Sequence, residues 1–135
     1  MAGIADETTV LSLKFDQTGL IGAILTNASD GTLLMFAHMT REALEKTIAT
    51  GRLHLYSRSR KVPWQKGETS GETFSVTSIL TDCDQDVLQV KVEPDGQGAA
   101  CHTGRKSCFY RKIVDGKLIF TDNKKLFDPD FVYRK

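Results

Sequence analysis

The 135-residue sequence predicts an α+β fold, a small mixed and mostly antiparallel β-sheet domain with one main helix. Two observations support this class. Short apolar or β-branched runs alternate with turn residues, as in sheet proteins, whereas one segment alone carries helix signals at both ends. The length fits a single domain over residues 1–135, with enough chain for a small hydrophobic core.

The first half of the chain contains a predicted β-hairpin. Residues 1–8 form a loose start, and residues 10–15 alternate only weakly between apolar and polar. Residues 20–25 are an apolar run typical of a buried strand, and residues 32–37 are expected to pair with it. The intervening segment ends in Asp30-Gly31, which supplies the positive φ that a tight hairpin turn needs.

A helix is expected directly after this hairpin. Thr40 suits the N-cap, Glu42 lies in the first turn where acidic residues are favourable, and Gly51 suits the left-handed position after the end. Leu44 and Ile48 are four residues apart, so both are expected to face the core.

The second half alternates predicted strands with polar connections. Strands are expected at residues 53–57, 73–80 and 87–92, and a last strand pair within 109–120. Residues 58–71 are expected to form a polar loop and residues 94–98 a flexible connector. The last fifteen residues, charged and aromatic, carry no clear pattern.

Composition excludes several classes of protein. The net charge is +1, so no global field favours nucleic acid or an acidic membrane. The longest apolar run falls far short of the roughly 20 residues of a membrane span. Three cysteines and no apolar leader argue against a secreted, disulfide-linked protein. The expected location is the cytoplasm, with no nucleic-acid or membrane partner.

All three cysteines lie between Asp82 and Cys108, together with three aspartates at alternate positions. In an extended backbone Asp82, Asp84 and Asp86 would share one face, with neighbouring carboxylates roughly 7 Å apart, and Cys83 would face the other way. Oxygen ligands of this kind suit Mg²⁺ or Ca²⁺, whereas thiolates suit a softer ion such as Zn²⁺. The segment therefore predicts sites for two different metals.

Simpler interpretations exist for the same residues. An Asp-rich turn is often only a solvated loop, and cysteines are often small buried apolar residues. Cys101 and Cys108 do not form a C-x-x-C pair. The joint occurrence of cysteine, charge, glycine and histidine nevertheless favours a metal site. His102 follows Cys101 directly and is a candidate for proton transfer, or else a supporting or structural residue; His38 and His54 are expected to be structural.

A second polar cluster lies between residues 57 and 71. Arginines, lysines, hydroxyls and glycines are concentrated there, a mixture that suits phosphate groups. The segment lacks the G-x-x-x-x-G-K-[ST] pattern, so a nucleotide-hydrolysing P-loop is unsupported. Trp64 could stack on a base or pack in the core. The alternative for the whole cluster is a solvated basic loop.

The motifs S-R-S-R, W-Q-K-G-E-T-S-G, D-C-D-Q-D and A-C-H-T-G-R-K-S-C-F-Y-R occur in this order. In this the sequence closely resembles the phosphoribosyl-AMP cyclohydrolase family over about residues 20–112, which leaves 113–135 unassigned. The resemblance implies an intertwined homodimer with one Zn²⁺ and one Mg²⁺ per subunit. It implies that Cys83 of one subunit and Cys101 and Cys108 of the other share zinc, and that Asp82, Asp84 and Asp86 hold magnesium. Glu72 stands where relatives often carry histidine, and no pyrophosphohydrolase domain is attached, so the monofunctional form is expected.

The resemblance also implies the reaction. It is a hydrolytic opening of the adenine ring of 1-(5-phosphoribosyl)-AMP at the N1–C6 bond, the third step of L-histidine biosynthesis, through a zinc-activated water. His102 or a neighbour would transfer the proton. Residues expected to hold the substrate and its two phosphates are Ser57, Arg58, Ser59, Arg60, Trp64, Lys66, Gly67, Glu68, Thr69, Ser70 and Arg105.

Two rival functions deserve comparison with this one. A zinc nucleobase deaminase adds water to adenine in a similar way, but its H-x-E and P-C-x-x-C signature is absent from the sequence. A binding module with a structural Cys₃His zinc would show a closed fourth ligand position, and a nucleic-acid-binding version would need a basic face that the near-neutral charge disfavours.

Overall fold

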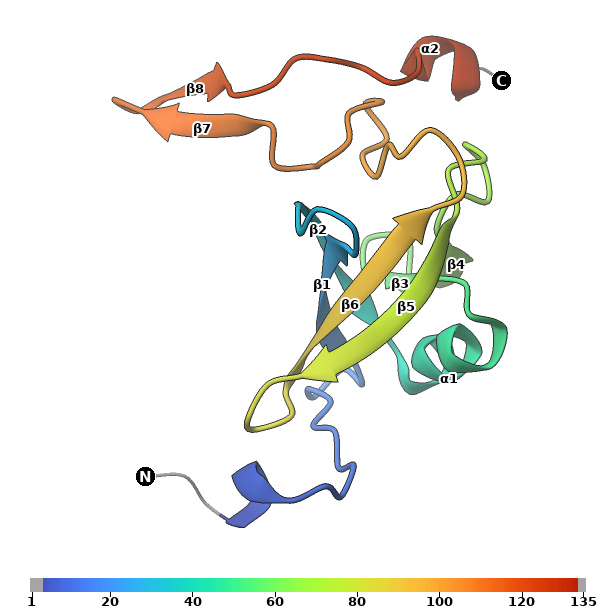
Figure 1. Ribbon diagram of the computed structural model, residues 1–135, viewed down its shortest axis with the longest axis vertical. Helices are drawn as coiled ribbons and strands as arrows, with labels where there is room; N and C mark the ends of the chain where they lie inside the picture. The colour runs from blue at the N-terminus through green and yellow to red at the C-terminus, as the bar shows by residue number, and fades with distance from the viewer. Residues whose placement is uncertain (1–3, 134–135) are drawn as a thin grey trace.

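Two strands that are far apart in the sequence, β1 and β6, pair in parallel at the centre of a four-stranded sheet (Figure 1). The computed structural model describes residues 4–133. The strand order is β2-β1-β6-β5, and the two outer pairings are antiparallel. This confirms the predicted mixed, mostly antiparallel sheet. The four strands are β1 (Ile21–Asn27), β2 (Leu33–Met39), β5 (Phe74–Thr81) and β6 (Val87–Pro94).

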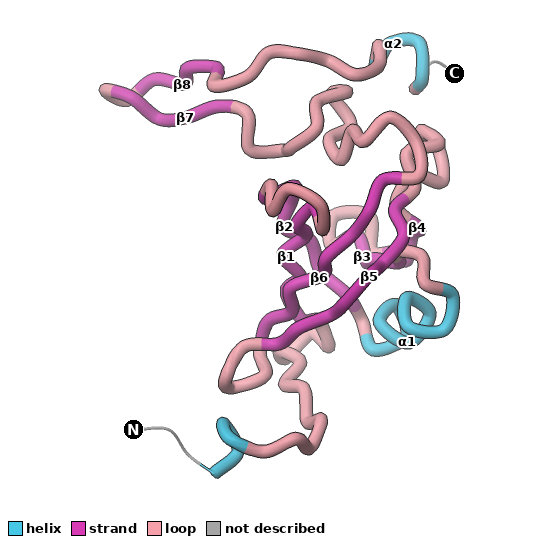
Figure 2. The backbone as a smooth tube through the Cα atoms, in the orientation of Figure 1, coloured by secondary structure: helices cyan, strands magenta, loops and turns pink. Residues whose placement is uncertain are grey.

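Two separate hairpins and three short helices complete the described chain. The hairpins pair β3 (His54–Ser57) with β4 (Val62–Gln65) and β7 (Arg111–Val114) with β8 (Lys117–Phe120). The main helix is α1 (Arg41–Thr50); the others are α2 (Pro129–Val132) and the 3₁₀-helix η1 (Ile4–Glu7). Figure 2 shows how much of the chain between these elements is loop. No helix in residues 4–133 has the length and hydropathy that crossing a bilayer would require.

The hydrophobic core lies on one face of the sheet. Alternate residues of β1, among them Ala23 and Leu25, are fully buried. The parallel register places Ala23 opposite Leu88 and Leu25 opposite Val90, so the buried positions of β1 and β6 reach the same face. Helix α1 and the β3–β4 hairpin pack on this side, as Figure 1 shows. Leu44 of α1, Leu53 directly before β3 and Leu55 of β3 belong to the same cluster.

The predicted turn and cap signals are confirmed. The Thr40 side chain accepts a hydrogen bond from the backbone N–H of Ala43 at 3.1 Å, which satisfies one free donor at the helix start. Gly51 ends the helix at a φ of 71°, and Gly31 closes the β1–β2 hairpin at a φ of 77°. Both positions are left-handed, where a Cβ atom would be strained.

The prediction that Ile48 faces the core is wrong, because 63% of its surface is exposed. The buried side of α1 is instead formed by Ala43, Leu44 and Thr47. The Thr47 hydroxyl donates to the Ala43 carbonyl at 2.8 Å and accepts from the backbone N–H of His54 at 3.0 Å. These bonds turn Thr47 toward β3, which rotates Ile48 out to solvent.

The polar segment 58–71 is not one loop, since residues 62–65 form β4. This strand pairs with β3 and places Leu55 opposite Trp64. Lys61 makes the connecting turn possible by adopting a φ of 58°. The predicted strand pair within residues 109–120 is confirmed as β7–β8, with its turn at Asp115 and Gly116. Residues 10–15 form no strand, although Leu13 and Phe15 pack against the core.

Candidate active site

The residues expected to carry the chemistry fall into two groups at opposite ends of β6. Asp82, Cys83, Asp84 and Asp86 lie in the turn before this strand, and the loop 101–108 follows it, as the two ends of β6 in Figure 1 show. An eight-residue strand spans about 23 Å. Within one copy of the chain, Cys83 is therefore separated from Cys101 and Cys108.

The three aspartates cluster in a turn and not on an extended strand, so the expected geometry is wrong although their proximity is confirmed. One carboxylate oxygen from each lies within 4.8 Å of the others. The turn closes because Gln85 adopts a φ of 59° and the Asp82 carboxylate accepts from the backbone N–H of Asp86 at 3.0 Å. Three surface oxygens at this separation suit a hard cation such as Mg²⁺.

The close carboxylates perturb one another. Partial burial acts to raise the pKa of Asp82, but hydrogen bonds with Asp84 and Asp86 prevail and hold it at about 2. The pKa of Asp86 is raised, chiefly because it shares a proton with Asp82 and Asp84. A cation between the three groups would remove the repulsion that causes this split.

Gln85 fixes the acidic turn to the N-terminal segment, a role the sequence did not reveal. Its side-chain oxygen accepts from the backbone N–H of Ser12 at 2.7 Å, and its amide donates to the Val10 carbonyl at 3.2 Å. Its backbone carbonyl also accepts from Lys14 at 2.8 Å. Residue 85 is buried at 9% exposure, so these bonds are protected from water.

At the other end of β6, Cys101 and Cys108 lie side by side. A hydrogen bond from the Cys108 thiol lowers the pKa of Cys101 to about 5, and the same bond, followed by burial, raises the pKa of Cys108. The Thr103 hydroxyl also donates to the Cys101 sulfur at 3.1 Å. Two adjacent sulfurs are suitable donors for Zn²⁺. His102 sits in the turn from Cys101 to Gly104 and is exposed.

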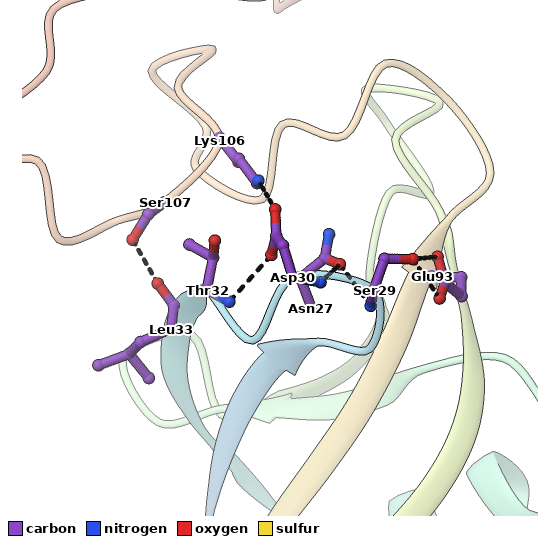
Figure 3. Close-up of polar contacts among 8 residues, drawn as sticks. All are labelled: Asn27, Ser29, Asp30, Thr32, Leu33, Glu93, Lys106 and Ser107. Atoms are coloured by element: carbon purple, nitrogen blue, oxygen red, sulfur yellow. Dashed lines mark hydrogen bonds and ion pairs between the residues drawn. The ribbon is translucent and has the colours of Figure 1, made fainter.

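The cysteine loop is fixed to the β1–β2 hairpin, as Figure 3 shows. Lys106 forms an ion pair with Asp30 in the turn of that hairpin. The Ser107 hydroxyl donates to the Leu33 carbonyl at 2.6 Å. The backbone N–H of Cys108 donates to the Leu34 carbonyl at 2.7 Å, so the sulfur is carried on a segment bonded to the start of β2.

A cavity of about 520 Å³ lies beside the cysteine pair. This size suits a nucleotide-sized ligand. Most of the predicted substrate residues line it, together with His102 and Cys108: Ser57, Ser59, Arg60, Trp64, Lys66, Gly67, Glu68, Thr69 and Ser70.

Lys66 has a special place in this cavity. Only 6% of it is exposed, and burial lowers the pKa of its amine, against the opposing influence of the Cys108 and Cys101 thiolates. Its ammonium also lies 5.6 Å from the centre of the Trp64 ring. The sequence placed Lys66 on a polar phosphate loop and gave no sign of this burial.

Three cavity or support residues were missed by the sequence reasoning. His38 lines the cavity. Its pKa is lowered, chiefly by burial and to a smaller extent by the positive charge of the nearby Arg58. Tyr133 also lines it, from a segment with no predicted structure. Glu72 is buried, and its Oε1 accepts from the backbone N–H groups of Gly98 at 3.0 Å and Ala99 at 3.2 Å. It thereby fixes the loop that leads into Cys101.

Two predicted substrate residues are not among the lining residues of the cavity. Arg58 is exposed beside it. Arg105 is buried at 7% exposure, with its guanidinium 4.2 Å from the centre of the Tyr110 ring and 5.2 Å from that of Phe120. These ring contacts give Arg105 a packing partner outside the cavity.

Comparison with known proteins identifies relatives along most of the chain. The family model described as phosphoribosyl-AMP cyclohydrolase matches residues 35–110. Phosphoribosyl-AMP cyclohydrolase of Bradyrhizobium diazoefficiens is 55% identical over 126 residues, which cover 90% of this chain and 89% of the relative. The protein of that name from Chelativorans sp. is 56% identical over 120 residues, covering 87% and 86%. That of Mesorhizobium japonicum is 51% identical over 134 residues, covering 96% and 88%.

Proposed function

The chain belongs to the phosphoribosyl-AMP cyclohydrolase family, and we propose that it opens the adenine ring of 1-(5-phosphoribosyl)-AMP in L-histidine biosynthesis. Water contributes its oxygen to C6 and the N1–C6 bond breaks. One water proton ends on the exocyclic nitrogen and the other on N1. The product is the phosphoribosyl-formimino aminoimidazole carboxamide ribotide.

The proposed zinc site combines Cys101 and Cys108 of one copy with Cys83 of a second copy. The proximity of Cys101 and Cys108, whose side chains are hydrogen-bonded to each other, supports the first part. The position of Cys83 at the far end of β6 supports the second, because the third sulfur must come from elsewhere. Zinc in such a site supplies Lewis-acid activation of a water molecule. The sites would be occupied once per subunit of a homodimer.

The same contact would bring the partner's acidic turn to the cavity, because Asp82, Asp84 and Asp86 flank Cys83. Their clustered oxygens suit Mg²⁺, which commonly meets substrate phosphates through its remaining positions. These three aspartates would then hold a divalent cation next to the cavity, where it would neutralise phosphate charge.

The remaining tasks fall to the residues that line the cavity. Ser57, Arg60 and the backbone N–H groups of residues 67–70 can bind the two phosphates, and Trp64 offers a face for the base. The buried Lys66 ammonium places a positive charge beside the reacting region and the thiolates. His102, exposed at the cavity edge, is the group proposed to move the proton.

The observation that carries this proposal is the joining of Cys108, His102 and the phosphate-loop residues in one cavity. The test uses purified protein, phosphoribosyl-AMP and an absorbance assay for ring opening, with metal analysis of the same sample. Cys101→Ser should lose both zinc and turnover, whereas Ser29→Ala in the β1–β2 turn should keep both. Full turnover by a zinc-free Cys101→Ser protein would refute the proposal.

A further inference from the structure

The β7–β8 hairpin carries apolar side chains that residues 4–133 leave exposed. Cross-strand partners share a face, so Ile113 and Leu118 lie on the same side as Phe120. Their exposed fractions are 79%, 58% and 53%. Figures 1 and 2 show the hairpin standing apart from the four-stranded sheet. A lone two-stranded hairpin is at best marginally stable in water, so this face requires a partner. We call residues 109–120 the arm.

The base of the arm contacts the loop that carries Cys101 and Cys108. Arg105, from that loop, packs against the rings of Tyr110 and Phe120 at the foot of the arm. The chain after the arm returns to the same loop, where the backbone N–H of Leu126 donates to the Gly104 carbonyl at 2.6 Å. The base of the arm is therefore held next to the loop that carries the cysteine pair.

An apolar groove lies away from the arm, between α1 and β5. It has a volume of about 400 Å³, and its lining includes Leu11, Leu13, Ile48 and Leu80. Ile48 and Leu80 are 63% and 41% exposed. Leu80 lies two residues before Asp82, so the groove adjoins the turn that carries Cys83.

We propose that the arm of one copy of this chain packs its Ile113 and Leu118 face into the groove of a second copy. This inference rests on the proposed function, because a shared zinc site needs the partner's Cys83 beside Cys101 and Cys108. That contact brings the partner's acidic turn to the base of the arm, and the groove next to the turn follows it. A two-fold axis repeats the contact, so each copy supplies one arm and one groove.

The arm is tested by Ile113→Asp, with Lys112→Asp as the matched control. Lys112 is the neighbouring residue on the opposite face of the same hairpin. Sedimentation equilibrium should give a dimer dissociation constant at least about 100-fold higher for Ile113→Asp, because each dimer buries the charge twice. Lys112→Asp should shift it less than about 5-fold. Ile48→Asp in the groove should weaken the dimer as Ile113→Asp does.

Circular dichroism melting accompanies these measurements, and Leu118→Asp is the second variant if Ile113→Asp fails to fold. A monomeric wild type overturns the inference, and so does a dimer whose dissociation constant is unchanged by both Ile113→Asp and Leu118→Asp. A dimer unchanged by Ile48→Asp overturns the groove as the receptor. Loss of the dimer in the arm and groove variants, with zinc content falling in parallel, supports it. If the wild type is a dimer that lacks turnover, the proposed function fails while the arm result stands. If the wild type has turnover but Ile113→Asp and Leu118→Asp leave its dimer unchanged, the arm inference fails while the proposed function stands.

Discussion

Replacing Glu72 tests how the loop before Cys101 is held. Its Oε1 alone accepts from both Gly98 and Ala99, and the residue is only 6% exposed. Glu72→Ala leaves two buried N–H groups without an acceptor, each costing about 1–3 kcal/mol. We therefore expect a loss of about 2–6 kcal/mol in the free energy of unfolding, measured by urea denaturation of the zinc-free protein.

Glu72→Gln is the matched control, because a single amide oxygen has two lone pairs and can accept both bonds. It loses only the charge assistance, so the expected cost is about 1–2 kcal/mol. Zinc affinity should fall more in Glu72→Ala than in Glu72→Gln, since the released loop leads directly into Cys101. Equal stability of the two variants would refute the hydrogen-bond reasoning, and undiminished zinc affinity in Glu72→Ala would refute the link to the cysteine loop.

Two further predictions concern the segments that hold the cysteine loop. Gly104→Ala should lower the free energy of unfolding by at least about 1 kcal/mol more than Gly116→Ala does. Urea denaturation of the two variants measures this difference. Both glycines have positive φ, but a Cβ at residue 104 would collide with the backbone carbonyl oxygen of Phe127, whereas a Cβ at residue 116 would meet open space. Equal losses of unfolding free energy in the two variants would contradict this crowding. The hydrogen bond from Lys106 holds the pKa of Asp30 well below its usual 3.8, so its stabilisation is present above that pH and is lost as pH falls through the folded value. The stability gap between wild type and Asp30→Asn should narrow progressively as the pH falls below about 4, and a gap that stays constant down to pH 2 would show that the charge is irrelevant.

Local signals in the sequence predicted the parts of the fold that depend on near neighbours. The Thr40 cap, the Asp30-Gly31 turn and the β7–β8 turn are set by backbone preferences that a short segment carries with it. The prediction that Ile48 is buried was wrong because the buried side of α1 is set by the hydrogen bond between Thr47 and His54. His54 lies outside the helix, so the helix pattern alone does not contain this information.

The candidate site shows the same division. Residue chemistry indicated which aspartates and cysteines belong together by type, but not that β6 separates Cys83 from Cys101 and Cys108. The burial of Lys66 and the support from Glu72 arise from tertiary packing that no local pattern encodes. Gln85 offered no local signal, since glutamine is not among the residues that favour the positive φ it adopts in this turn.

The most direct measurement mixes two inactive variants, Cys83→Ser and Cys101→Ser, under conditions that exchange subunits. If the zinc site is shared between copies, half of the dimers are mixed and each mixed dimer restores one of its two sites. Turnover and bound zinc should then recover to about a quarter of the wild-type values. No recovery after proven exchange, as measured by mass-tagged subunits, would contradict a site built from two copies of the chain.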